Sequence, residues 1–206
     1  DYFGRWKALH YAAKRFYAPL LLSVEDVGKT MSVHLTSDLP DPCDVTVRWR
    51  LETTTGEILA SGEKTLRAPA LQDTRVAVLD FSGQVTDANQ RHLVFVCELW
   101  EKNQHVSGSI TPFVPNKHLG LEPTPIKRGI TAENGTLPDT VAITLHAPFL
   151  ARFVELEFPD IDVVFSDNYF DLSPNQPITV TVSLPAGWTV EQAREKLLIR
   201  SLVDSY

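Results

Sequence analysis

The chain has 206 residues, enough for one large β domain or for two domains of about 100 residues each. Its composition is 43% hydrophobic and 22% charged, close to the averages of globular proteins, which argues against extended disorder. The net charge of −7 argues against a nucleic acid or an anionic membrane surface as partner. No apolar run approaches the roughly eighteen residues that a membrane-spanning helix needs.

The first twenty residues predict an amphipathic helix that ends before Pro19. A helix of about fifteen residues is marginal alone in water, so we expect it to need a partner surface. The chain begins with Asp1 rather than Met, and we therefore expect it to be part of a larger protein. In this chain alone, the helix should fold back on the first β domain, pair with a second copy, or fray. The predicted apolar face consists of Phe3, Trp6, Leu9, Ala13, Phe16 and Leu20.

After Pro19 the pattern changes to short runs that alternate in twos, which is typical of half-buried strands. In residues 44–51, Val45 and Val47 are predicted to face the core, whereas Arg48 and Arg50 are predicted to face water. Short strands with turns between them indicate a sandwich of immunoglobulin type. The predicted strands are 29–36, 44–51, 58–67, 75–79, 92–99 and 105–113.

Four prolines between residues 112 and 125 surround Leu119 and Gly120 and predict a domain boundary there. A second, smaller sandwich is expected beyond it. Its predicted strands are 140–145, 153–158, 161–165, 178–182 and 197–202. Thr189 and Gln192 fit a capping box, which predicts one or two helical turns over 190–196.

Two cysteines leave the redox compartment open. Cys43 and Cys97 could be buried free thiols or a bridge between neighbouring strands, and the free-thiol interpretation is preferred. Asn134-Gly-Thr136 fits both an N-glycosylation pattern and a hairpin turn, of which the turn is preferred.

Three stretches carry a family resemblance. Phe3-Gly-Arg-Trp-Lys-Ala-Leu-His-Tyr11, followed by Ala18-Pro-Leu-Leu-Leu-Ser23, resembles the end of the catalytic barrel of family 2 β-mannosidases. Phe113-Val-Pro-Asn-Lys-His-Leu119 is similar to the junction between the two C-terminal modules of that family. Ser166-Asp-Asn-Tyr-Phe-Asp-Leu172 and Ile199-Arg-Ser-Leu-Val-Asp204 resemble strands of its last immunoglobulin-like module.

The resemblance implies an all-β chain with one leading helix. Residues 1–17 would be the last helix of an upstream TIM barrel, and residues 18–118 and 121–206 would be two tandem immunoglobulin-like β-sandwiches. It also implies a function: non-catalytic accessory modules of a retaining exo-glycosidase that hydrolyses terminal β-D-mannosides without a cofactor. The parent protein would be the enzyme, because the catalytic glutamates belong to the barrel, and no catalytic residue is expected in this chain. The expected partners are that barrel, the oligosaccharide substrate through the parent, and a second copy of the chain in a homodimer.

Four aromatic residues are candidates for contact with sugar. Under the resemblance, Tyr2 or Phe3 borders the substrate cleft of the intact enzyme, because barrel active sites lie in loops that follow the strands. The alternative is that these rings only pack the start of the helix. Tyr169 and Trp188 are candidates for stacking on a sugar ring, with core packing as their alternative. Two rival functions remain open: a carbohydrate-binding module, and immunoglobulin-like domains of a surface interaction protein.

No metal site is predicted. The six histidines are scattered, and no Cys-x-x-Cys pair is present. Asp38, Asp41 and Asp44 could gather around Ca²⁺, although a solvated turn is the preferred interpretation. The compartment, secreted, periplasmic or cytoplasmic, is left open.

Overall fold

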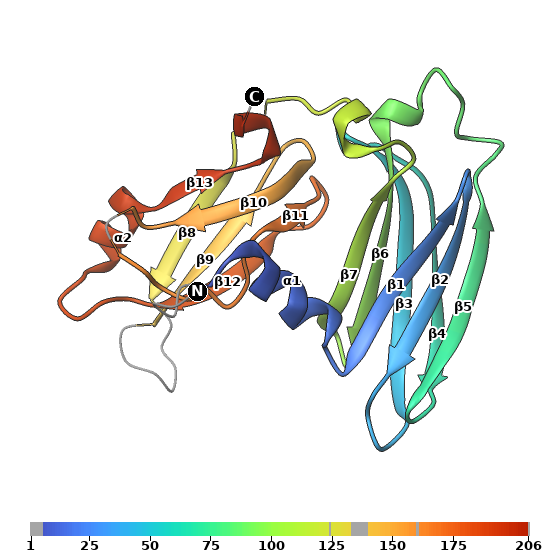
Figure 1. The fold of residues 1–206 in the computed structure, drawn as a ribbon, viewed down its shortest axis with the longest axis horizontal. Coiled ribbons are helices and arrows are strands. Elements are labelled where there is room, and N and C mark those ends of the chain that lie inside the picture. Colours follow the sequence, from blue (N-terminus) through green and yellow to red (C-terminus); the bar gives the residue numbers. More distant parts are fainter. Residues whose placement is uncertain (1–5, 124, 133–139, 160, 206) are drawn as a thin grey trace. The chain divides into compact units, whose positions relative to one another are not determined.

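The computed structural model describes residues 6–123, 125–132, 140–159 and 161–205 (Figure 1). The chain divides into two compact units. The N-terminal unit comprises Lys14–Gly120, and the C-terminal unit combines Leu121–Tyr206 with the N-terminal residues up to Ala13. The first helix, α1 (Ala8–Phe16), therefore begins in one unit and ends in the other. The predictions made for Tyr2, for Phe3 and for the turn at 134–136 concern residues outside the described ranges.

The N-terminal unit contains two antiparallel sheets with the orders β1-β2-β5 and β4-β3-β6-β7. The first sheet consists of β1 (Leu20–Val27), β2 (Thr30–Ser37) and β5 (Gln72–Asp80). The second consists of β3 (Cys43–Thr53), β4 (Ile58–Ala68), β6 (Leu93–Glu101) and β7 (Gln104–Pro112). Two short 3₁₀ helices, η1 (Gln90–His92) and η2 (Asn116–His118), lie in the connections.

Alternation along the strands builds the core between these sheets. In β2, Met31 and Val33 are fully buried while their strand neighbours are half-buried, and Val47 and Phe95 face them from the second sheet as part of the same buried cluster. The Lys64 ammonium donates to the Val76 carbonyl at 2.7 Å and so joins strands of different sheets. The alternation predicted β2 to β7 with end errors of a few residues, but β1 was not predicted.

Arg50 does not face water, which corrects the sequence-based expectation. Its guanidinium binds both carboxylate oxygens of Glu98, at 2.9 and 3.4 Å, and binds Glu52 at 3.2 Å. Glu52 and Glu98 are both buried. Arg48, by contrast, is exposed and pairs with the exposed Glu63. The alternation did place Arg50 on the outer side of the sheet, but it could not show that Glu98 lies beside it there.

The two cysteines are free thiols, as the preferred interpretation predicted, but only Cys97 is buried, whereas Cys43 is half-buried. Cys97 lies opposite Trp49 in the register of β6 and β3. Cys43 stands six residues before Trp49 on β3. At about 3.3 Å per residue, this separates the thiols by roughly 20 Å, far beyond the reach of a disulfide.

The C-terminal unit also contains two antiparallel sheets, with the orders β12-β9-β8 and β11-β10-β13. The first consists of β8 (Lys127–Ala132), β9 (Thr140–His146) and β12 (Ile178–Ser183). The second consists of β10 (Ala151–Glu157), β11 (Phe170–Leu172) and β13 (Leu198–Arg200). The helix α2 (Val190–Lys196) precedes β13, and the 3₁₀ helix η3 (Leu202–Ser205) follows it.

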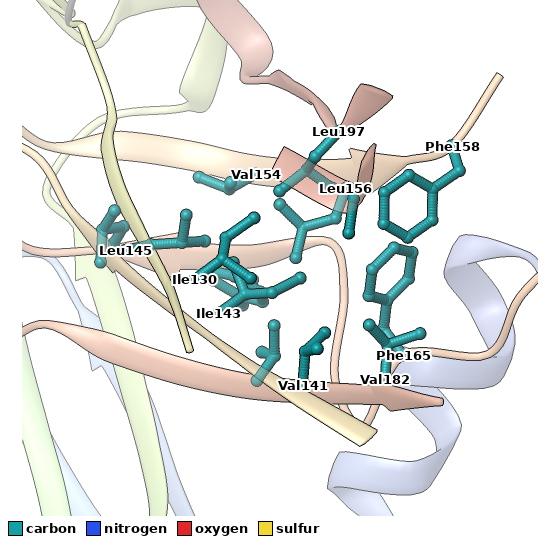
Figure 2. Close-up of a cluster of buried hydrophobic side chains, with 14 of the residues drawn as sticks. Ile130, Val141, Ile143, Leu145, Val154, Leu156, Phe158, Phe165, Val182 and Leu197 are labelled. Carbon is teal, nitrogen blue, oxygen red and sulfur yellow. The ribbon is translucent and has the colours of Figure 1, made fainter. Parts of the chain in front are cut away.

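Apolar side chains from both sheets and from the loops form the core of this unit (Figure 2). Ile143 and Val154 are fully buried, and the rings of Phe158 and Phe165 stack at 5.8 Å between centroids. The predicted strand over residues 161–165 is wrong, because of its residues Phe165 alone pairs with a strand, through an isolated bridge to Val182.

The predicted helical turns at 190–196 are confirmed as α2. The Gln192 N–H donates to Thr189 Oγ1 at 3.2 Å, and the Thr189 N–H donates to Gln192 Oε1 at 2.8 Å. This reciprocal pair satisfies donors that the first turn of a helix otherwise leaves open.

The helix α1 is shorter than predicted, and its buried side is not the predicted apolar face. Tyr11 is its one buried residue, at 2% exposure, and it belongs to the core of the C-terminal unit. Leu9 is 72% exposed and Phe16 is 48% exposed. The expectation that the helix folds back on the first β domain is therefore wrong for the turn that holds Tyr11. The buried phenol is favoured because it brings both ring area and a hydroxyl that finds a partner.

Candidate binding site

A cleft of about 220 Å³ lies in the C-terminal unit, beside β10 and the start of α1. Alternation along β10 decides which of its side chains reach the cleft wall. Leu156 points into the core, whereas Glu155 and Glu157 lie on the other side of the strand and are half-buried. Both carboxylates line the cleft, together with the exposed Asp162.

Asn168 fixes the backbone next to this wall. Its amide side chain donates to the Leu156 carbonyl at 2.9 Å and accepts from the Leu156 N–H at 2.8 Å. The same side-chain oxygen accepts from the Tyr169 N–H at 2.9 Å. Asn168 thus takes the place of a strand partner for Leu156 of β10. The next residue, Tyr169, has a φ of 55°. A bulky residue in this left-handed region is uncommon and costs about 1–3 kcal/mol.

Tyr169 faces the carboxylates as a result of this turn. Its hydroxyl donates to Glu155 Oε1 at 2.7 Å. Burial and the hydrogen bond to Glu155 raise the pKa of Tyr169 well above its usual range, so the phenol stays a donor at neutral pH. Arg200 on β13 binds Glu157 and approaches Glu155 at 3.6 Å. Both carboxylates are therefore held in place from the side of β13.

Three aromatic rings, which we call the aromatic row, lie next to one another: Trp6 just before α1, Tyr11 on α1 and Tyr169 just before β11. The centroids of Trp6 and Tyr11 are 5.2 Å apart, and those of Tyr11 and Tyr169 are 5.9 Å apart. Tyr11 lies at the bottom, where burial raises the pKa of its hydroxyl and where that hydroxyl accepts from the Phe165 N–H at 3.2 Å. Trp6 and Tyr169 are half-buried and border the opening.

The structure separates the predicted sugar-stacking residues. Tyr169 lines the cleft, but Trp188 is not among the residues that do. The Lys196 ammonium lies 5.2 Å from the Trp188 ring, and Phe158 meets that ring at 5.3 Å in an edge contact. Trp100 in the N-terminal unit is covered in a similar way, by the Arg48 guanidinium at 5.1 Å and by His105 at 5.5 Å. Tyr2 and Phe3 lie outside the described residues.

Sequence reasoning missed most of this site. Trp6 was assigned to the helix face, Tyr11 was not singled out, and Glu155 was one acidic residue among 26. The one available signal was the run Phe153-Val-Glu-Leu-Glu-Phe158, whose alternation places both glutamates on the same face of a strand.

Among the described residues, no group of three or more His, Cys, Asp or Glu side chains could hold a metal ion, and this includes Asp38, Asp41 and Asp44. Within the same residues, no helix has the length and apolar character to cross a membrane.

Comparison with known proteins assigns each unit to a domain family. Residues 29–118 match the family model of the mannosidase Ig/CBM-like domain, and residues 122–205 match that of the mannosidase Ig-fold domain. The two units are therefore tandem immunoglobulin-like modules of the kind found in mannosidases.

Curated relatives match this chain along its whole length. A β-mannosidase A of Aspergillus terreus is 25% identical over 99% of this chain and 23% of its own length. A β-mannosidase of Capra hircus is 26% identical over 100% of this chain and 24% of its own length. The chain thus spans about a quarter of the length of the curated relatives that it matches.

Solved structures show the same fold. A β-D-mannosidase from Dictyoglomus thermophilum superposes with a TM-score of 0.86 at 17% identity, covering 98% of this chain and 24% of that one. An exo-chitosanase from Amycolatopsis orientalis superposes with a TM-score of 0.66 at 16% identity, covering 93% of this chain and 26% of that one. Taken together, the two family models show that the chain consists of immunoglobulin-like domains of the mannosidase type, and along its whole length it is similar to the C-terminal region of glycoside hydrolase family 2 β-mannosidases.

Proposed function

We propose that this chain forms the non-catalytic accessory modules of a retaining exo-glycosidase that removes terminal β-D-mannosides. The catalytic barrel would belong to the upstream part of the same polypeptide, and α1 would be its last helix. The observation that carries the proposal is the end-to-end match of this chain to about a quarter of each curated β-mannosidase.

The two sides of α1 support separate roles for the immunoglobulin-like modules and the catalytic barrel. Tyr11 anchors one side in the C-terminal unit. Leu9 and Phe16 are seven residues apart, which is close to two helical turns, so they share a face; Tyr11, two residues from Leu9, points away from it. Exposed apolar side chains on a common face mark an interaction surface. We assign this face to the catalytic barrel, and the immunoglobulin-like modules to holding the helix in place.

A retaining mechanism needs two carboxyl groups that flank the scissile bond, and a barrel supplies them at the ends of its strands. In this proposal no residue of the chain takes part in bond cleavage. Tyr2 and Phe3 come just before the helix and would border the substrate cleft of the intact enzyme. Alanine at Tyr2 in the complete polypeptide should then raise the Michaelis constant for a β-mannoside, whereas packing of the helix start alone would leave it unchanged.

The test compares the complete polypeptide with this chain. The complete polypeptide should hydrolyse p-nitrophenyl β-D-mannopyranoside and release the β anomer first, as seen by NMR, and this chain alone should not. In the complete polypeptide, a Leu9→Asp, Phe16→Asp double variant should lose stability and activity together. Val27→Asp is the matched control, because Val27 is 67% exposed on β1 and lies away from α1 in sequence.

Two results would overturn the proposal. One is a complete polypeptide without activity on β-mannosides. The other is a double variant with unchanged stability and turnover. A dimer of this chain that the same double variant dissociates would assign the Leu9 and Phe16 face to self-association instead.

A further inference from the structure

The cleft of the C-terminal unit combines two kinds of surface. Trp6 and Tyr169 present half-buried aromatic rings, and Glu155 and Glu157 present carboxylates. Carboxylates accept hydrogen bonds but do not donate them, so the cleft favours a ligand rich in donors. The rings favour a ligand that also has an apolar face.

A pyranose ring meets both requirements. Its C–H groups form an apolar face that packs on aromatic rings, and its hydroxyls at the ring edge donate to carboxylates. We propose that the cleft binds one pyranose unit of a saccharide, with Trp6 and Tyr169 against the C–H face and Glu155 and Glu157 accepting from hydroxyls. This site does not depend on the accessory role or on the presence of a catalytic barrel.

The carboxylates of Glu155 and Glu157 can accept hydrogen bonds from sugar hydroxyls in addition to the bonds that they already make. A carboxylate has about four lone-pair positions on its two oxygens. Glu155 Oε1 accepts from Tyr169, and Arg200 occupies the Oε2 side of both Glu155 and Glu157. The bonds that fix these groups also lower the entropy cost of binding, because the side chains are already ordered.

The volume fits one sugar ring rather than a chain of rings. Pockets for drug-sized ligands measure about 300–1,000 Å³, whereas this cleft measures about 220 Å³. A single hexoside in such a site should bind weakly, with a Kd on the order of 1 mM. The site would therefore act as a contact for one unit of a larger glycan.

The experiment is an NMR titration of the 206-residue chain with methyl β-D-mannopyranoside, and in parallel with the β-D-glucoside and with protonated glucosamine. The chain has four tryptophans, so four indole N–H signals report on separate places. The Trp6 indole and the amides of Glu157 and Tyr169 should shift together in a saturable way, while the indoles of Trp49, Trp100 and Trp188 stay in place. Glucosamine binding alone would replace the neutral saccharide with an ammonium ligand and would overturn the proposal.

Variants make the assignment specific. Trp6→Ala should weaken binding at least tenfold. Glu157→Gln keeps the size of the side chain at a half-buried position, and should weaken binding several-fold with the dispersion of the amide spectrum unchanged. Tyr17→Ala is the control, because Tyr17 is 79% exposed and does not line the cleft. Absence of saturable shifts, shifts centred on Trp100 or Trp188, or equal binding by Glu157→Gln and the unaltered chain would each refute the site.

Discussion

The hydroxyl of Tyr11 accepts a hydrogen bond from the backbone N–H of Phe165 at 3.2 Å, across 154 positions of sequence. Phe165 is buried, and it is also the residue that bridges to Val182 on β12. One side chain of α1 therefore completes the backbone hydrogen bonding of a core loop in the C-terminal unit. This ties the start of the chain to a sheet formed near its end.

Tyr11→Phe should destabilise the C-terminal unit by about 1–3 kcal/mol. The ring remains, but the buried N–H of Phe165 loses its acceptor, and an unsatisfied buried donor costs about that much. Urea denaturation followed at amide signals of β9 and β12 measures the change. Tyr17→Phe is the control, since Tyr17 is 79% exposed and its hydroxyl should not matter. Equal midpoints for both variants would show that the Tyr11 hydroxyl contributes nothing.

Arg50→Met should be among the most damaging changes on the second sheet of the N-terminal unit. The substitution leaves Glu98, which is 4% exposed, without the guanidinium that binds both its oxygens. Removing one partner of a buried ion pair costs about 3–5 kcal/mol. Thermal unfolding of the two variants Arg50→Met and Arg48→Met provides the comparison.

Arg48 is the matched control for Arg50. It lies two residues away on β3 and pairs with Glu63, but both side chains are exposed. An exposed pair of this kind contributes about 0–1 kcal/mol. A loss for Arg48→Met as large as that for Arg50→Met would mean that burial of Glu98 does not set the cost.

Gly62→Ala should destabilise the N-terminal unit by about 1–3 kcal/mol. Gly62 pairs with Trp49 across β4 and β3, and a Cβ at position 62 would lie 2.5 Å from Trp49 Cζ2. The indole ring is rigid, so it would have to leave its place over the strand. Gly83→Ala serves as the comparison, because a Cβ there would meet no atom within 4 Å. Calorimetric unfolding with equal midpoints for the two alanine variants would count against this contact.

The sequence predicted the parts of the fold that depend on neighbours along the chain. Alternation located β3 and β10, and the spacing of Thr189 and Gln192 located the start of α2. The residues that escaped prediction depend on partners far away in sequence. The environment of the Arg50 guanidinium depends on Glu98 on another strand, and the Tyr11 hydroxyl finds its hydrogen-bond partner at Phe165.

The candidate site shows the same limit. Tyr169 could be proposed because an aromatic side chain is informative by itself. Its neighbours could not, because Trp6 and Glu155 meet it only once α1 lies on the C-terminal unit. Trp188 looked equivalent to Tyr169 in sequence, but its ring contacts Phe158 and Lys196 and does not line the cleft.

The Cys97 thiol should give the stability of the N-terminal unit a dependence on alkaline pH. Burial raises the pKa of Cys97 from an ordinary value of about 9 to about 12. The unfolded chain therefore loses this proton as the pH passes about 9, while the folded chain keeps it. Between these two values the folded state binds more protons than the unfolded state, so the free energy of unfolding falls as the pH rises, by up to about 1.4 kcal/mol per pH unit.

Urea midpoints at pH 8, 9 and 10 test this, because the upper limit stays at the ordinary pKa of tyrosine, about 10. Cys97→Ala should reduce the loss of stability between pH 9 and 10, whatever its fixed cost from the smaller side chain. Cys43→Ala should retain most of that loss, because Cys43 is only half-buried and its thiol is less shielded from water. The same slope in the unaltered chain and in Cys97→Ala would mean that the Cys97 thiol ionises equally in the folded and unfolded states.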